Sequence, residues 1–156
     1  THLWLNEGFA TWAADLAVDT LFPKWQTWMQ FVCSTFSAAL RLDALQSSHP
    51  IEVEIARSHQ VNEIFDAISY CKGASAIRML VEFLGLETFQ KGLRYYFTQH
   101  PYKNTATEDL WAALETAADK IKVGDIMGKW TQQVGYPLLQ VQKQADGTFT
   151  VSQERF

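Results

Sequence analysis

The segment from His2 to Phe22 constrains the fold more than any other part of the chain. Its apolar side chains occur almost all the way round a helix, and Pro23 then ends the pattern. A helix that is apolar on every side is normally buried. The polar exceptions recur at every fourth position and form one slowly drifting stripe: Glu7, Thr11, Asp15 and Asp19. The segment therefore predicts a largely buried helix with one acidic stripe.

Gly8 follows Glu7 inside this helix, where a glycine costs about 1 kcal/mol relative to alanine. Such a cost is usually tolerated where another backbone must come close. Gly8 therefore predicts a neighbouring helix packed directly on this one, with the Glu7 carboxylate beside the contact. Spacing alone favours the other interpretation, in which Glu7 is a solvent-facing acid at the head of the stripe.

Helical spacing of apolar residues continues through most of the chain and predicts a mainly α fold. The expected helices span 25–45, 70–84, 86–99, 105–120 and 124–134. Gly85 ends the second of them, and Thr105 or Thr107 caps the fourth. Loops are expected at 46–61, with a short extended piece, and at 101–106. After Gly135-Tyr136-Pro137 the pattern alternates instead, around an Asp146-Gly147 turn. We expect helical residues 1–137 to be followed at 138–156 by two strands that begin a separate β unit.

Charge and cysteine content narrow the function classes. The formal net charge of −4 and the lack of a basic run argue against nucleic acid or an anionic membrane as partners. No apolar run reaches the roughly 18 residues that a membrane span needs. Cys33 and Cys71 make no disulfide framework, which favours a reducing compartment, with the cytoplasm as the simplest choice.

Both ends of the chain resemble cuts through a larger protein. Thr1 leads without any polar segment into the apolar helix, and Phe156 directly follows a strand pattern. We therefore expect the 156 residues alone to be inactive and only partly stable, because the first helix exposes apolar surface without its partner.

The histidines do not form a metal site by themselves. None of His2, His49, His59 and His100 has another at the four-residue spacing that places two imidazoles on one helical face. His2 and Glu7 are separated by about 140° around a helix, too far to share one ion. Taken alone, the sequence offers no complete zinc ligand set.

A resemblance to a known family suggests a role for Glu7. The stretch H-L-W-L-N-E-G-F-A-T-W from His2 resembles the second zinc helix of the M1 family of zinc aminopeptidases. The resemblance implies that Glu7 is the third ligand of one Zn²⁺ ion. The other two ligands would then be the histidines of an H-E-x-x-H helix, the second of which would lie about a dozen residues before Thr1.

A second stretch, F-D-A-I-S-Y-C-K-G-A-S from Phe65, resembles the catalytic tyrosine segment of the same family. The resemblance implies that Tyr70 donates to the oxyanion of the transition state; without it, Tyr70 reads as an ordinary half-buried tyrosine. Further likeness at 84–93, 107–111 and 130–137 extends it over essentially the whole chain. The S-H-P-I stretch at 48–51 fits the branch with puromycin-sensitive and fungal alanine/arginine aminopeptidases.

The resemblance implies the C-terminal helical half of a thermolysin-like metallopeptidase catalytic domain, followed by the first strands of a β-sandwich. Its partners would be peptides with a free N-terminus and the missing N-terminal part of the same domain. Two alternatives stay open: a zinc hydrolase of the leukotriene type, and a helical scaffold that has lost its metal. An intact H-E-x-x-H upstream would favour an enzyme, and its absence would favour the scaffold.

Four other residues have weaker claims to a role. Asp15 reads as part of a solvated stripe rather than as a partner of a metal ligand, and Lys72 could set local electrostatics without a defined family role. His49 and His59 read as surface histidines in a loop that could border the substrate.

Overall fold

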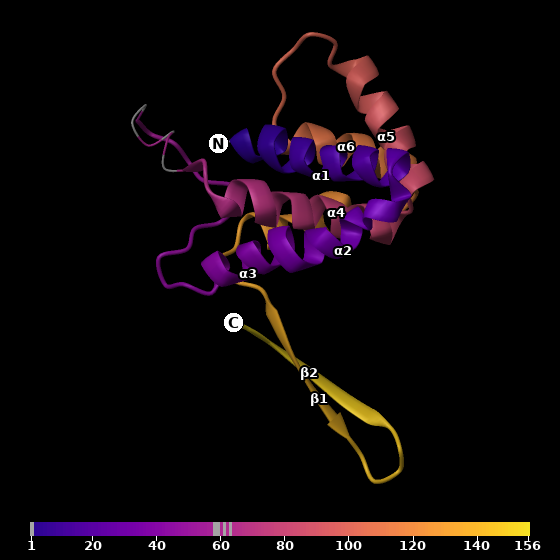
Figure 1. The fold of residues 1–156 in the computed structure, drawn as a ribbon. Helices are drawn as coiled ribbons and strands as arrows, with labels where there is room; N and C mark the ends of the chain where they lie inside the picture. Colours follow the sequence, from indigo (N-terminus) through magenta and orange to yellow (C-terminus); the bar gives the residue numbers. More distant parts are fainter. Residues whose placement is uncertain (1, 58–59, 61, 63) are drawn as a thin grey trace.

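The computed structural model describes residues 2–57, 60, 62 and 64–156. It has a helical body and one two-stranded antiparallel sheet, so the mainly α prediction is confirmed (Figure 1). The elements are the α-helices α1 (Leu3–Leu21), α2 (Thr27–Phe31), α3 (Ser37–Asp43), α4 (Gly73–Leu84), α5 (Leu86–Gln99), α6 (Thr107–Ala117) and α7 (Val123–Thr131), the 3-10 turn η1 (Pro23–Trp25), the π-helical turns η2 (Val32–Phe36) and η4 (Ile68–Lys72), and the strands β1 (Pro137–Lys143) and β2 (Phe149–Arg155).

The predicted first helix forms as α1, but only one side of it is deeply buried. Trp4, Gly8 and Trp12 are buried, whereas Leu21 is 70% exposed at the end of the helix. Figure 1 shows α1 lying alongside α4, with α2 next to them. The expectation that most of α1 is buried is therefore wrong within the described residues, because its neighbours there cover only part of its circumference.

The second predicted helix begins at Thr27 rather than at Trp25, because Gln26 has a left-handed backbone with φ 52°. It runs through α2, η2 and α3 and so contains a π-helical turn that apolar spacing did not reveal. No strand forms among the described residues of the loop at 46–61.

The core of the body lies where α1, α4, α5, α6 and α7 meet. Its fully buried side chains come from all five helices: Trp4, Ile77, Leu80, Phe89, Leu110, Leu114 and Met127. Gly85 ends α4 with φ +82°, as the sequence predicted.

The start of α6 is capped differently from the prediction, which named Thr105 or Thr107. The N-cap is Ala106, and the Asp109 carboxylate accepts from the Ala106 N–H at 2.8 Å. His2 Nδ1 accepts from the Thr107 N–H at 3.1 Å, so a side chain 105 residues away satisfies one of the free helix-end donors. Sequence spacing could not anticipate that partner.

The two predicted strands form a hairpin that extends away from the helical body (Figure 1). Val141 pairs with Val151, and the turn contains Gly147 with φ +86°. Nearly all of its side chains are exposed. At its base the Tyr136 and Phe156 rings stack with centroids 5.0 Å apart.

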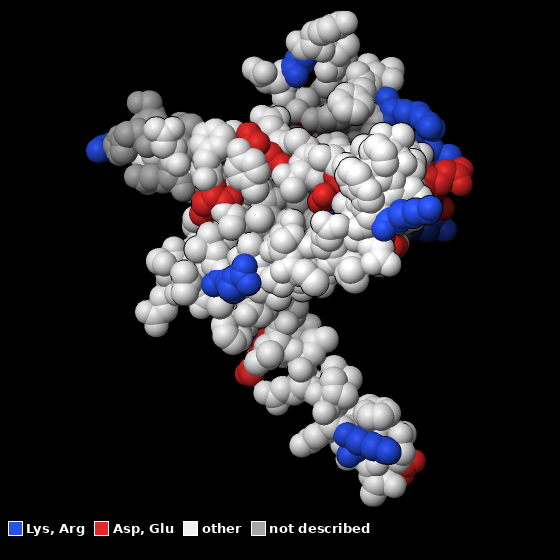
Figure 2. All heavy atoms as spheres, in the orientation of Figure 1, with Lys and Arg blue, Asp and Glu red and all other residues white. Residues whose placement is uncertain are grey.

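Charges are dispersed over the face drawn in Figure 2, where basic side chains lie at separate points rather than in one patch. Among the described residues, none of the helices has the length and apolar character that a membrane crossing requires.

Candidate active site

The two segments singled out by the sequence meet where α1 crosses η4 and the start of α4. A Cβ atom added at Gly8 would lie 2.8 Å from the carbonyl carbon of Gly73 and 2.9 Å from its Cα. One added at Gly73 would lie 3.2 Å from the Gly8 Cα. The two backbones are therefore in direct contact, and the prediction that Gly8 allows a close helix approach is confirmed.

This contact brings the side chains of Glu7 and Tyr70 together. Both are half-buried, and the pKa of Tyr70 is raised above its ordinary value. The largest cause is hydrogen bonding of the phenol to the Glu7 carboxylate; partial burial and the negative charge of Glu7 add to it. The carboxylate and the phenol thus share one local environment although they lie far apart in sequence.

Tyr70 lies in the π-helical turn η4, where the Gly73 N–H donates to the carbonyl of Ile68, five residues back. Single π turns inside α-helices are often found at functional sites, since they change the direction in which side chains project. The sequence predicted a helix that begins at Tyr70, so both the π turn and the earlier start at Ile68 were missed.

Asp66 caps this turn. Its Oδ1 accepts from the N–H groups of Ile68 at 2.9 Å and Ser69 at 3.2 Å. Its Oδ2 lies 2.8 Å from His49 Nε2, so the loop histidine is tied to the start of the tyrosine segment. His49 is therefore half-buried and paired instead of being a plain surface residue, whereas His59 lies outside the described residues.

Lys72 points into the protein on the other side of η4. Its Nζ lies 2.8 Å from Asp43 Oδ2 and donates to the carbonyl oxygens of Gln133 at 2.9 Å and Gly135 at 3.3 Å. Asp43 Oδ1 accepts from Ser48 Oγ and from the Gly135 N–H, each at 2.9 Å. This buried network joins η4 to α3 and to the segment before β1. Sequence reasoning had suggested only local electrostatics for Lys72.

Asp15, which the sequence placed on a solvated stripe, is half-buried. Partial burial raises the pKa of its carboxyl above the ordinary value, and the charge of Arg78 on α4 partly opposes that rise. The Arg78 guanidinium also lies 4.4 Å from the ring centroid of Trp28. Asp15 therefore lies about two turns beyond Glu7 on α1, within reach of the charge of Arg78.

Glu7 would supply one metal ligand and no more from this part of the protein. Within residues 2–57, 60, 62 and 64–156, no three His, Cys, Asp or Glu side chains gather closely enough to hold an ion. His2 is engaged elsewhere, with Nδ1 3.0 Å from Thr107 Oγ1. A half-buried carboxylate is a suitable oxygen ligand for zinc, so Glu7 fits the group in type, and further ligands have to come from another segment.

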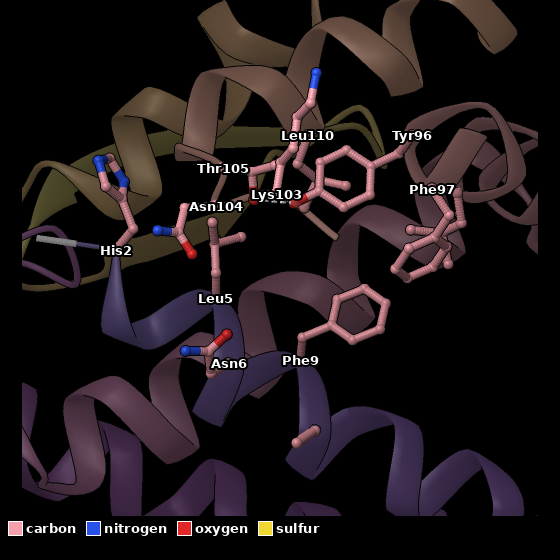
Figure 3. Close-up of a pocket in the computed structure, with 12 residues that line it drawn as sticks. His2, Leu5, Asn6, Phe9, Tyr96, Phe97, Lys103, Asn104, Thr105 and Leu110 are labelled. Carbon is pink, nitrogen blue, oxygen red and sulfur yellow. Dashed lines mark hydrogen bonds between the residues drawn. The ribbon is translucent and has the colours of Figure 1, made fainter. Parts of the chain in front are cut away.

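A separate cavity of about 570 Å³ lies on a different side of α1 (Figure 3). Leu5, Asn6 and Phe9 face Tyr96 and Phe97 of α5 across it. Its described lining residues include neither Glu7 nor Tyr70. The cavity is therefore distinct from the place where those two side chains meet.

Comparison with known proteins identifies the class to which this fold and site belong. The family model of the peptidase family M1 domain matches residues 1–130, which include both α1 and η4. The chain belongs to peptidase family M1.

Individual relatives match over nearly the whole chain. Aminopeptidase M1 of Arabidopsis thaliana is 54% identical over 156 residues, which are 100% of this chain and 17% of that protein. The alanine/arginine aminopeptidase of Saccharomyces cerevisiae is 46% identical over 154 residues, covering 99% of this chain and 18% of that protein. Aminopeptidase 2, mitochondrial, of the same yeast is 47% identical over 99% of this chain and 16% of that protein. The chain thus spans about a sixth of the length of these relatives.

Proposed function

We propose that this chain is part of a zinc aminopeptidase that hydrolyses the N-terminal peptide bond of peptides. The proposal is supported above all by the meeting of Glu7 and Tyr70 at the contact between Gly8 and Gly73. Both residues lie in motifs of a family to which the chain belongs, and the relatives named above are aminopeptidases.

Glu7 is the zinc ligand that this chain contributes. The backbone contact of the next residue holds this part of α1 against the start of α4, and the Glu7 side chain projects from it beside η4. When bound, zinc lowers the pKa of water and polarises the carbonyl of the scissile bond. The remaining ligands, two histidines of an H-E-x-x-H helix, belong to the preceding part of a thermolysin-like catalytic domain of which α1 to α7 form the C-terminal half.

Tyr70 donates its phenol proton in a hydrogen bond to the oxyanion that develops on the substrate carbonyl. A donor that meets the oxygen only once it carries charge stabilises the transition state more than the bound peptide. A phenol is protonated at neutral pH, as a donor requires. One donor of this kind contributes roughly 100- to 1000-fold in kcat.

The test uses the full-length protein. Tyr70→Phe should lower the kcat for an alanyl or arginyl anilide roughly 100-fold or more while KM changes little. Tyr95→Phe, at an exposed tyrosine of α5, is the matched control and should leave both constants unchanged. Full turnover by the Tyr70→Phe enzyme would reject the catalytic role of Tyr70.

Glu7→Ala should abolish retention of zinc, measured as metal content after gel filtration. Glu82→Ala, at an exposed position on α4, should keep one zinc ion per chain. A stoichiometric zinc content in the Glu7→Ala protein would remove the ligand assignment, whatever the activity. If the unsubstituted enzyme binds a full equivalent of zinc but does not cleave the anilides, the result would instead favour another class of zinc hydrolase.

We also propose that the β-hairpin begins a β-sandwich domain.

The protein is further proposed to work in a reducing compartment such as the cytoplasm. Cys33 and Cys71 are both free thiols, which suits that compartment. Cell fractionation with an antibody tests the location, and recovery in a secreted fraction would contradict it.

A further inference from the structure

We propose that Lys72 is a positioning residue that holds the π-helical turn η4 so that Tyr70 stays beside Glu7. The inference rests on the proposed catalytic role of Tyr70. It goes beyond that role because the contacts of Lys72 are with Asp43, Gln133 and Gly135, so the lysine acts through the backbone of the turn.

The surroundings of Lys72 are those of an anchor. The residue is only 7% exposed, and Asp43 is 3% exposed. All three ammonium donors have an acceptor: the Asp43 carboxylate and the carbonyls of Gln133 and Gly135. A buried lysine with a full set of partners is costly to move, since any shift strands a charge away from water.

The acceptors of Lys72 lie on segments distant from η4 along the chain. Asp43 is the last residue of α3, and Gln133 and Gly135 lie between α7 and β1. The Asp43 carboxylate is itself held by the Gly135 N–H and by Ser48 Oγ. The lysine therefore ties η4 to two other segments, α3 and the stretch before β1, and these contacts restrain the position and the rotation of the turn.

Lys72 and Tyr70 project from opposite sides of this turn, because residues two apart on a helix are separated by roughly half a turn. Tyr70 faces Glu7 on α1, while Lys72 faces α3. Gly73, the next residue, contacts Gly8. The turn is thus fixed between α1 on one side and the buried ion pair on the other.

The π turn makes this anchoring necessary. A π turn holds one more residue than an α turn, so relaxation to a regular α-helix would rotate the preceding residues by about 100° relative to α4. That rotation would carry the Tyr70 phenol away from Glu7. The ammonium of Lys72 opposes it, because its three acceptors are met only while the turn keeps its present shape.

The experiment measures whether the loss of Lys72 acts through Tyr70. In the full-length enzyme, Asp43→Asn with Lys72→Met removes both charges together, and the asparagine can still accept from Ser48 and Gly135. We expect a fall in kcat of roughly ten- to hundredfold, because small displacements of a catalytic group have effects of this size. KM and zinc content should change less than about twofold, as expected when only a transition-state interaction is lost.

The decisive comparison adds Tyr70→Phe. If Lys72 acts by positioning the phenol, the pair of substitutions should lower kcat no further once the phenol is absent. An equal loss in the presence and in the absence of the Tyr70 hydroxyl would overturn the inference, as would an unchanged kcat with Tyr70 present. If Tyr70→Phe alone has no effect, the proposed function fails instead, so the two failures are distinguishable.

Two further variants complete the test. Lys91→Met changes an exposed lysine of α5 and should leave kcat unchanged. If the Lys72→Met pair gives no folded protein, Asp43→Asn with Lys72→Gln keeps polar groups on both sides of the contact and enters the same comparison. A Tyr70-dependent loss of kcat supports the inference, and a Tyr70-independent loss overturns it.

Discussion

The contact between α1 and η4 differs from the β-hairpin in how far apart along the chain its partners lie. Gly8 and Gly73 touch across the helical body, and Lys72 binds Asp43 and Gly135. In the hairpin every pairing is local, from Val141 with Val151 to the turn at Gly147. The site is thus built from long-range contacts, whereas the hairpin is specified by neighbouring residues.

This difference teaches where substitutions should matter. In the helical body Lys72 and Asp43 are held by groups from several segments, so a change at either should disturb all of them. In the hairpin nearly every side chain is exposed, and a change should stay within a few residues of its origin. The two regions can be tested separately because the hairpin extends away from the body (Figure 1).

The largest loss of folding stability is expected from a substitution at Asp43. Asp43→Asn leaves the buried ammonium of Lys72 without its carboxylate, which should cost about 3–5 kcal/mol. The matched control is Glu87→Gln in the exposed pair Lys91–Glu87, which has the same 2.8 Å separation but 59% and 83% exposed side chains.

Urea unfolding followed by circular dichroism measures both variants, and Glu87→Gln should leave the midpoint unchanged because solvent screens that pair. Adding Lys72→Met to Asp43→Asn should recover most of the loss, since both charges are then removed. Equal midpoints for Asp43→Asn and Glu87→Gln would contradict the contrast between buried and exposed pairs.

A smaller effect is expected at Gly8. Gly8→Ala places a methyl group 2.8 Å from the Gly73 carbonyl carbon, and a backbone atom cannot move aside as a side chain can. The strain should destabilise the fold by about 1–3 kcal/mol. Gly128→Ala on α7 is the control: its nearest neighbour would be Gln132 Oε1 at 3.6 Å, and it should stabilise the fold by about 0.4–1 kcal/mol. The two substitutions should therefore shift the urea midpoint in opposite directions.

The close approach at Gly8 could be predicted from the sequence, because a glycine inside an apolar helix is tolerated mainly where a second backbone needs the space. The hairpin was equally predictable, since alternation and an Asp146-Gly147 turn specify it locally. The nearness of Glu7 to Tyr70 was expected only through the family resemblance, because no spacing rule connects residues so distant in sequence.

The buried network and the π turn could not be predicted. Lys72 is one of many lysines until its partner is known, and Asp43 lies on another helix with no pattern to connect them. The π turn lies between α1 and α3, whereas apolar periodicity indicates only that a helix is present. The structure of this part of the site depends on polar partners that are far apart in the sequence. The pattern of a single sequence does not indicate which residues those partners are.

The smallest effect is expected in the hairpin turn, at Asp146. Hydrogen bonds from the Thr148 hydroxyl, the largest cause, and from the Thr148 N–H hold the pKa of Asp146 below its ordinary value of 3.8. Because the folded pKa is lowered, the stabilisation is present above pH 3.8 and is lost as the pH falls through the folded value. Thr148→Val should raise the pKa towards the ordinary value in a titration of the Asp146 carboxyl carbon by NMR. Because the contacts of the hairpin are local, the amide signals of α1 and η4 should not move in the Thr148→Val protein. Shifts of the amide signals of Glu7 or Tyr70 would contradict the contrast between the hairpin and the helical body.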